Sequence, residues 1–349
     1  MKKTLLLATG ALMAAGFAVD ANAVDVELYG QVNKVAVSTD NGTSTETTFN
    51  DNDKSSTRVG LKGEQALDNG LTASVLVEYE LNTDTSNADL MTTTSSTAST
   101  LTERHARVGI AGDFGAVFVG HTSTATDGIY EIDLAGASDL MGSSFNKIGG
   151  GTAFAQKSGT TAAQTVNSSF TNFDGGRADL VAYHSPVVSG FQGQLTTSEG
   201  GDIQAAVRYS GKYDAFAVKA GLGYEMNEDR TTAATDEAKL AGSISVKHDS
   251  GIAGTVAYGQ ANNENGAEAS TVYVKAGYAF DAFEVAVDFA KSEADDALNT
   301  EGKSFGIGGQ YNLGHGVSLA AAYRTMEVEK DAANYDDIDQ IMANLRVKF

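Results

Sequence analysis

The sequence predicts an all-β fold: a 16-stranded antiparallel transmembrane β-barrel with a long third loop folded into its lumen. Runs of roughly ten residues alternate apolar and polar side chains, which is the period of a β-strand. The connections between these runs alternate between tight turns and long polar loops, as in outer-membrane barrels. One connection, residues 122–174, is much longer than the rest and carries both apolar and acidic side chains.

The N-terminal 23 residues have the pattern of a secretory signal peptide. Lys2 and Lys3 form a charged region, residues 5–19 an apolar region, and residues 21–23 a small-residue cleavage site. The apolar run is too short to cross a membrane as a helix, and no later stretch reaches about 18 apolar residues. We therefore expect an exported protein whose mature chain, residues 24–349, forms one barrel domain.

Composition excludes several classes of function. The 349 residues include 45 acidic and 24 basic side chains, for a net charge of −21. This balance argues against nucleic acid as a partner, because nucleic-acid binding needs basic patches. The sequence has no Cys, and its five histidines show no metal-ligand spacing. We find no clustered Ser/His/acid set either, so we expect no metal, no cofactor and no enzyme activity.

The strands are predicted in order along the mature chain. The first is Val24 to Val37, and the clearest is Leu71 to Leu81. In the latter, residues 71, 73, 75, 77, 79 and 81 are apolar or aromatic, and residues 72, 74, 78 and 80 are polar. The same alternation recurs over residues 216–225, 283–289, 317–324 and 341–349. Such alternation places one face of each strand toward lipid and the other toward water.

The connections carry the turn residues that this arrangement needs. The tight ones contain the Gly, Asn or Asp of hairpin turns and are residues 68–70, 113–115, 188–190, 212–214, 249–251, 281–282 and 312–316. The long polar ones are residues 38–54, 82–102, 226–237, 261–269, 291–302 and 329–337, with residues 199–202 a short exception. Phe residues fall at the short-turn ends of strands and Tyr residues at the long-loop ends, which is typical of interfacial girdles, although aromatics are enriched in strands generally.

The first half of the connection at residues 122–174 is predicted to be ordered. Loops above roughly 12–15 residues are uncommon unless they are functional or disordered. This half contains residues able to bury, among them Ile129, Tyr130 and Phe145. The same half carries four acids, which are Asp127, Glu131, Asp133 and Asp139. A loop that packs and also presents carboxylates is what a channel needs to narrow its own bore.

Several segments together resemble the trimeric general porins of Gram-negative outer membranes. They are VELYG at 26–30, STRVGLKGE at 56–64, RVGIAGDFG at 107–115, YHSP at 183–186 with Gly190-Phe191, and the last strand ending in Phe349. The resemblance covers nearly the whole mature chain. It implies a third loop at mid-height in the barrel whose acids face basic residues on the opposite wall. It also implies that the terminal Phe349 is recognised by the outer-membrane assembly machinery.

The resemblance assigns roles to individual wall residues. Arg58 and Arg177 stand where the family places basic wall residues, and Lys62 belongs to the lumen-facing bases. Gln31 and His121 stand where a basic residue is common in the family. Both therefore reduce the positive charge of the wall that faces the acids of the third loop. The same side chains also fit structural roles: the arginines as ion-pair partners within the wall, the loop acids as solvated groups, and His121 as a packed strand-end residue.

The expected function is an outer-membrane porin for passive diffusion of ions and small hydrophilic solutes. Lumen-facing acids and bases are comparable in number on the wall, so the loop acids are expected to make the channel weakly cation-selective. The alternatives are a substrate-specific facilitator, and an adhesin that uses acidic extracellular loops. The expected partners are two further copies of the chain in a homotrimer, lipopolysaccharide and outer-membrane lipid, the assembly machinery, and the solutes.

Two further features have open interpretations. Acids in the predicted surface loops are most simply solvated, but they also suit Ca²⁺ or Mg²⁺ bridging to lipopolysaccharide phosphates; they are Asp51, Asp53, Asp84, Asp89, Glu228, Asp229, Asp236, Asp295, Asp296, Asp336 and Asp337. The Ser/Thr-rich run at residues 91–102 is either a flexible polar loop or, as the resemblance implies, a loop that reaches over a neighbouring subunit.

Overall fold

The computed structural model describes residues 24–92, 99–159, 163–227, 236–263, 268–294, 299–331 and 333–349. The predicted signal peptide, residues 93–98 of the Ser/Thr-rich run at 91–102, and four of the predicted surface acids (Glu228, Asp229, Asp295 and Asp296) lie outside these ranges.

Strands make up nearly all of the regular structure. The strands of the first half are β1 (Asp25–Asp40), β2 (Thr45–Asp51), β3 (Arg58–Ala66), β4 (Thr72–Asn82), β5 (Thr100–Gly112), β6 (Gly115–Ser123), β7 (Gln156–Ser158), β8 (Arg177–His184), β9 (Phe191–Ser198) and β10 (Ile203–Tyr213). Those of the second half are β11 (Phe216–Met226), β12 (Asp236–His248), β13 (Ile252–Asn263), β14 (Glu268–Phe280), β15 (Phe283–Ala294), β16 (Thr300–Gly314), β17 (Val317–Glu329), β18 (Asn334–Tyr335) and β19 (Ile338–Lys348). The helices described are one 3₁₀ turn, η1 (Phe145–Lys147), and one short α-helix, α1 (Val166–Ser169).

The main sheet closes on itself as a barrel. It contains 17 of the described strands, and every pairing between neighbours is antiparallel. Both β2 and β3 pair with the same edge of β1, one beyond the other, so they are two parts of one interrupted strand. The barrel therefore has 16 strands, and β1 completes it by pairing with β19. The predicted fold class is confirmed.

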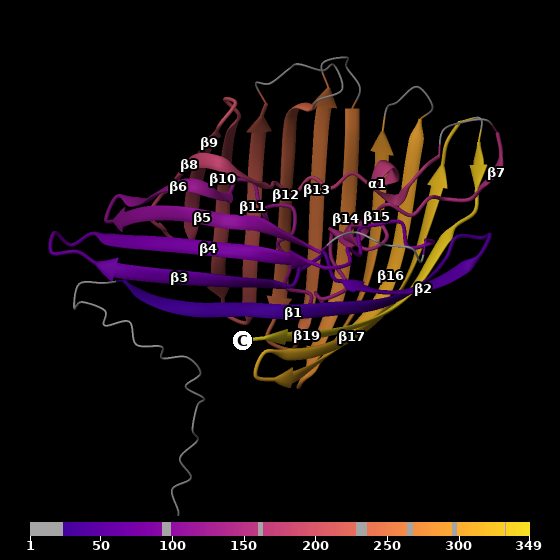
Figure 1. Ribbon diagram of the computed structural model, residues 1–349, viewed down its shortest axis with the longest axis horizontal. Coiled ribbons are helices and arrows are strands. Elements are labelled where there is room, and N and C mark those ends of the chain that lie inside the picture. The colour runs from indigo at the N-terminus through magenta and orange to yellow at the C-terminus, as the bar shows by residue number, and fades with distance from the viewer. Residues whose placement is uncertain are drawn as a thin grey trace, which may run out of the picture.

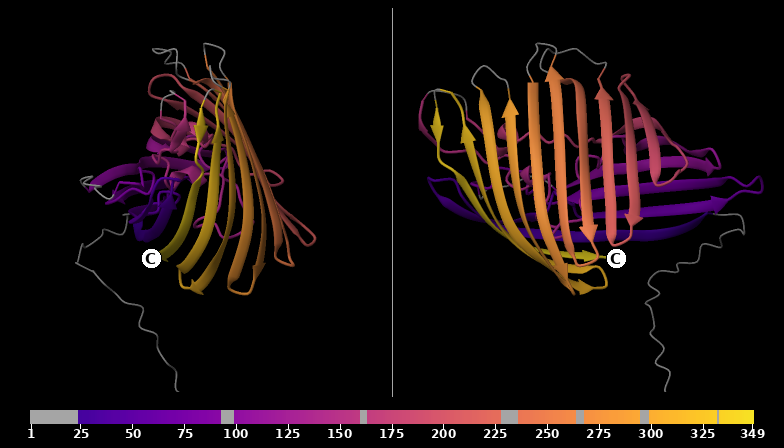
Figure 2. Two further views of the ribbon diagram at one scale, coloured as in Figure 1. Left: turned by 90° about the vertical axis from the view of Figure 1, so that its right-hand side faces the viewer. Right: turned by 180° about the vertical axis from the view of Figure 1, so that it is seen from behind.

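Two opposed walls enclose the interior. In Figure 1 the strands β1 and β3–β6 run across the front of β10–β17, and the rear view in Figure 2 shows the second wall in front of the first. Strands of the two walls cross because barrel strands tilt relative to the barrel axis. The two walls join where β19 pairs with β1 and where β9 pairs with β10.

Side chains alternate between an apolar outer face and a polar inner face. On β17, Leu319 and Tyr323 are 45% and 39% exposed, whereas Ser318 and Arg324 are 4% and 1% exposed. The exposed apolar side chains continue around the barrel, as expected of a surface in contact with lipid. Within the described ranges, no helix has the length and hydropathy needed to cross a membrane.

The first long connection differs from its prediction. Residues 38–54 were expected to form a loop, but β1 extends to Asp40 and β2 begins at Thr45. The turn between them is held by side chains, because Asp40 accepts a hydrogen bond from the Gly42 N–H at 2.8 Å and Asn41 accepts one from the Thr43 N–H at 3.1 Å. The Thr-rich sequence of β2 is polar but has high β-propensity, so its polarity alone misled the prediction.

The second strand is interrupted at residues 52–57 rather than continuous. Inward-facing side chains of β1 hold the interruption: Gln31 Nε2 donates to the carbonyls of Ser55 and Ser56, each at 2.8 Å, and Asn33 Nδ2 donates to the Ser55 carbonyl at 2.7 Å. These bonds satisfy backbone groups that a regular ladder would otherwise pair. The interruption places Lys54 at the inner face, with its Nζ 3.1 Å from Ser144 Oγ.

A charged substitution on the outer face tests whether this face of the strands contacts lipid. Val256 is 48% exposed in the middle of β13, and we expect Val256→Arg to lower the free energy of unfolding by about 2–4 kcal/mol in lipid vesicles. Equilibrium unfolding in urea measures this. The matched control is Leu101→Arg, because Leu101 lies on the same face at the long-loop end of β5, where the cost is about 0–1 kcal/mol. Equal costs at the two positions contradict the assignment.

Candidate functional site

The segment between β6 and β8, residues 122–174, lies against the inner face of the second wall. We call it the long loop. The N–H groups of Ile132 and Leu134 donate to the side chains of Ser243 and Ser245 on β12, at 3.1 and 2.8 Å. Those serines are buried on the face opposite the exposed Ile244. The left view of Figure 2 shows the magenta chain of this loop between the two walls.

Asp133 attaches the long loop to β14. Its carboxylate lies 2.5 Å from Lys275 Nζ and accepts a hydrogen bond from Thr255 Oγ1 at 2.6 Å. The lysine side chain is fully buried and also donates to the Gly136 carbonyl at 2.5 Å. Because this ion pair is enclosed, Asp133 holds the loop in place instead of presenting a free charge to the channel.

Asp139 makes a second attachment, to β17 and β19. Its carboxylate lies 2.7 Å from Arg346 Nη2 and accepts a hydrogen bond from Ser318 Oγ at 2.5 Å. The residue is fully buried. Asn52, in the interrupted second strand, donates to the Asp139 carbonyl at 2.9 Å. Both walls thus contact this one residue of the loop.

The loop acids near its two ends form a separate group. Asp127 Oδ2 lies 3.6 Å from Arg177 Nη2, and Asp174 accepts a hydrogen bond from the Gly128 N–H at 2.7 Å. Burial, together with the nearby charges of Glu131 and Asp127, raises the pKa of Asp174 to about 9. At neutral pH this carboxyl therefore holds a proton, and it does not add to the negative charge of the loop.

An apolar cluster fixes the rest of the loop. Tyr130, Phe145, Phe170 and Phe173 are buried together, along with alanines of the second wall. Glycines let the loop backbone approach this wall. A Cβ added at Gly277 would lie 1.7 Å from the Ala135 carbonyl oxygen, a distance that no side chain tolerates.

The first wall presents basic side chains to the interior. Arg104 lies 2.6 Å from Glu78 and 2.8 Å from Glu80, and Arg58 Nε lies 3.5 Å from Glu78. Of the two predicted wall arginines, Arg58 pairs with Glu78 and Arg177 with Asp127 of the long loop, each within 4.0 Å. Arg58 and Arg104 of this wall are therefore engaged in ion pairs with Glu78 and Glu80.

Three predicted wall residues have other environments. Gln31 is 3% exposed and holds the strand interruption. His121 is opposite Ala106 and Asp179 in the register, on the same face as the exposed Val119, so it points outward and not into the channel. Lys62 pairs with Glu27 at 3.2 Å and is half-exposed near the short-turn end, away from the long loop.

The structure adds basic residues that the sequence analysis did not single out. Arg104 reaches the interior because the β4–β5 register shifts between Glu78 and Tyr79, and strict alternation cannot reveal such a shift. Lys54 was assigned to a surface loop. Lys275 follows the alternation of β14, so its inward position was readable, but its partner Asp133 lies 142 residues away in sequence.

Two predicted surface acids are bound within the protein instead of solvated, Asp51 buried and Asp53 partly buried. Asp51 is 1% exposed, lies 2.6 Å from Lys34 Nζ, and accepts hydrogen bonds from Thr57 and Thr83. Asp53 accepts a hydrogen bond from the Asn87 N–H at 2.7 Å. Both tie the second long connection to the end of β2. Among the described side chains, no group of three or more His, Cys, Asp or Glu residues is placed to hold a metal ion.

The comparison with protein families decides the identity of the chain. Residues 5–331 match the family model described as Gram-negative porin. The chain belongs to this family. As a porin it is a multi-pass β-barrel of the outer membrane, and it forms a channel for small solutes. None of the curated proteins compared by sequence matches the chain.

Solved porin structures share its fold at low sequence identity. The anion-selective porin of Comamonas acidovorans is 16% identical, with a TM-score of 0.65, and the match covers 94% of this chain and 100% of that one. The outer-membrane channel DcaP of Acinetobacter baumannii is 13% identical, with a TM-score of 0.62 and coverages of 96% and 100%. OmpF of Salmonella typhi is 14% identical, with a TM-score of 0.60 and coverages of 95% and 99%.

Removing Lys275 tests the attachment of the long loop. Lys275→Met leaves the Asp133 carboxylate enclosed without its cation, so we expect the free energy of unfolding to fall by about 3–5 kcal/mol. We also expect more frequent current fluctuations in single channels, because the loop loses a fixed point. Lys212→Met is the control, because Lys212 pairs with Asp249 at an exposed site. Exposed ion pairs contribute little to stability. Similar losses of stability in both variants contradict the assigned role.

The pKa of Asp174 predicts a dependence of stability on pH. A carboxyl whose folded-state pKa is raised binds more protons in the folded protein than in the unfolded chain. The protonated Asp174 carboxyl contributes its full stabilisation below about pH 4, which is its pKa in the unfolded chain. This stabilisation is lost progressively as the pH rises to about 9, the pKa in the folded protein. Asp174→Asn should flatten this decline when unfolding is measured from pH 4 to pH 9. An unchanged slope in the variant shows that Asp174 is ionised in the folded protein.

Proposed function

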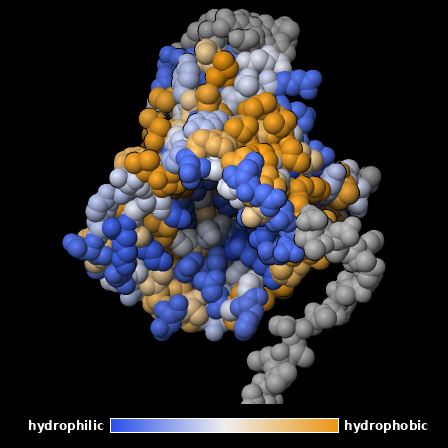
Figure 3. All heavy atoms as spheres, turned by 90° about the vertical axis from the view of Figure 1, so that its left-hand side faces the viewer, coloured by the Kyte–Doolittle hydropathy of each residue, from blue (hydrophilic) through white to orange (hydrophobic). Residues whose placement is uncertain are grey.

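We propose that this porin is a general channel through which ions and small hydrophilic solutes diffuse passively, with the long loop as its constriction. The observation that carries the proposal is the attachment of this loop to inward-facing side chains of the second wall, through Asp133 and Asp139. A barrel of 16 strands is wide enough to leave an aqueous passage beside such a loop. Figure 3 shows a hollow lined by hydrophilic residues, with hydrophobic residues around it.

The ion selectivity follows from where charges remain unpaired. The predicted cation preference rested on the four loop acids, but Asp133 and Asp139 are neutralised by buried partners and Asp127 lies near Arg177. Of the four, Glu131 alone has no ion pair among the described residues, so little unpaired negative charge remains on the loop. Acids at the long-loop mouth, such as Asp40, Asp89 and Asp337, keep the entrance negative. We propose a weak cation preference that arises at the mouth and is screened by salt.

The assembly proposal concerns four features. We propose that residues 1–23 are removed on export, and that the barrel forms a homotrimer; OmpT of Vibrio cholerae, 14% identical, has been solved in a trimer form. Phe349 and Gly30 exchange backbone hydrogen bonds of 3.0 Å at the closing seam, and the Phe349 ring covers Gly30. We propose this terminal strand as the signal for the assembly machinery, and lipopolysaccharide as the neighbour of the outer rim.

Planar-bilayer recordings test the channel and its selectivity together. We expect stable open steps from purified protein, and a reversal potential in a KCl gradient that shows cation preference at about 0.1 M. The preference should fall toward none at about 1 M, because the Debye length shortens from about 10 Å to about 3 Å. Absence of open steps contradicts the channel itself. Anion preference at low salt, or cation preference that persists at high salt, contradicts only the proposed origin of selectivity.

A further inference from the structure

Two arginines of the inner face, one on each wall, have no acidic partner among the described residues. Arg107 on β5 and Arg208 on β10 both face the interior, and among the described residues no carboxylate oxygen lies within 4.0 Å of either guanidinium group. Arg208 donates only to neutral oxygens, namely Gln194 Oε1 at 3.0 Å and the carbonyls of Ala125 and Asp127. This distinguishes the pair from Arg58, Arg104 and Arg177.

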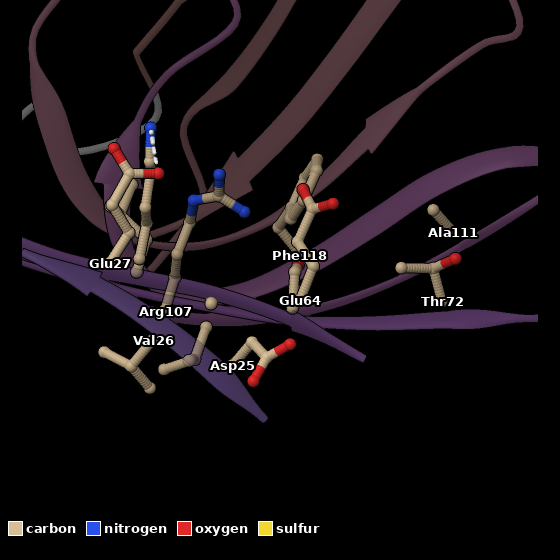
Figure 4. Close-up of a pocket in the computed structure, with 13 residues that line it drawn as sticks. Asp25, Val26, Glu27, Glu64, Thr72, Arg107, Ala111 and Phe118 are labelled. Atoms are coloured by element: carbon tan, nitrogen blue, oxygen red, sulfur yellow. Dashed lines mark ion pairs between the residues drawn. The ribbon is translucent and has the colours of Figure 1, made fainter. Parts of the chain in front are cut away.

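Arg107 also has an unused donor. Its Nη1 is buried and has no hydrogen-bond partner in the described part of the chain. A buried guanidinium N–H without a partner is costly, because it has lost water and gained nothing in exchange. Figure 4 shows Arg107 reaching away from its strand into a cavity. This donor is therefore free to bind an acceptor that enters the cavity.

The two arginines line one cavity. It has a volume of about 250 Å³, and its wall includes His105, His184 and the carboxylate-bearing Asp127. The larger cavity of Figure 4, about 850 Å³, shares Arg107, Phe118 and Leu76 with it, so the two cavities adjoin. With two unpaired guanidinium groups against one carboxylate, which lies 3.6 Å from Arg177, the smaller cavity has excess positive charge.

Aromatic packing holds Arg107 in position. Its guanidinium lies 4.0 Å from the centre of the Phe118 ring, and that ring meets His184 edge-on at 5.1 Å. An arginine fixed in this way loses less side-chain freedom on binding an anion than a mobile one does. Leu76 and Ala182 add apolar surface to the same cavity, next to the charged groups. The lining thus combines oxyanion donors with an apolar patch.

We propose that this cavity is a binding subsite for small organic carboxylates, which Arg107 and Arg208 hold while the apolar body of the solute rests on Leu76 and Phe118. Guanidinium groups bind the planar carboxylate through two parallel hydrogen bonds. The proposal rests on the channel function proposed above. It adds a solute class that the channel retains in passage, whereas neutral solutes of the same shape pass without delay.

The experiment uses purified full-length porin in a planar bilayer, with benzoate as the probe and benzamide as its neutral counterpart of the same shape. We expect benzoate to reduce the current in a saturable way, and benzamide to have no such effect. Arg107→Gln and Arg208→Gln should each raise the half-blocking concentration of benzoate about tenfold or more, which corresponds to about 1.4 kcal/mol. Phe118→Leu should raise it less, because the charge remains and only its support is lost.

Lys219→Gln is the matched control. Lys219 lies on the inner face of β11, opposite Ser245 in the register, and outside this cavity, so the variant makes the same charge change elsewhere in the channel. Its benzoate block should equal that of the unmodified porin. Retained open steps in each variant show that the barrel has formed. Equal block by benzamide, or an equal loss in all the charge variants, overturns the subsite. Absence of open steps in the unmodified protein overturns the channel function instead.

Discussion

The structure depends on the need of every backbone polar group inside a membrane for a hydrogen-bond partner within the protein. A sheet with free edges cannot meet this need in lipid, and a closed sheet can. Closure is completed where β1 pairs with β19, and the terminal Phe349 continues that ladder through its bonds to Gly30. Once the sheet is closed, alternation along each strand assigns one face to lipid and the other to the interior. Polar and charged residues that would destabilise an outer surface are then free to accumulate inside.

Several of those interior charges attach the long loop to the wall, and few of them act as unpaired charges in the channel. Asp133 with Lys275, and Asp139 with Arg346, are enclosed pairs that link the loop to strands of the second wall. Breaking such a pair is costly because the remaining charge stays buried. The charges that act on solutes in the channel are therefore the interior groups that do not belong to these enclosed pairs. Among the arginines in the described ranges, Arg107 and Arg208 are the two without a carboxylate oxygen within 4.0 Å.

The sequence predicted most of the strands but not the partners of their side chains. Alternation in residues such as 71–81 is a local signal, so it predicts the inner and outer faces directly. The partner of Asp133 lies 142 residues away and depends on how the barrel closes, so no local pattern indicates it. Arg104 was missed because a register shift brings it inward, and His121 was misplaced because its family position was trusted over its parity with Val119. The Thr-rich β2 illustrates a third cause of error, because its polar composition led to the prediction of a loop where the structure has a strand.

The interruption of the second strand explains why the long loop is held from two sides. A continuous strand at residues 52–57 would keep its backbone in the wall, and its side chains would reach the loop only from the wall surface. The interruption instead brings Asn52 to the Asp139 carbonyl and Lys54 to Ser144, while the far side of the loop is bound to Lys275 and Arg346. A segment bound on opposite sides has less freedom to move across the bore. The unpaired backbone groups of the interruption are in turn satisfied by Gln31, so the replacement of a basic residue at that position is part of the same arrangement.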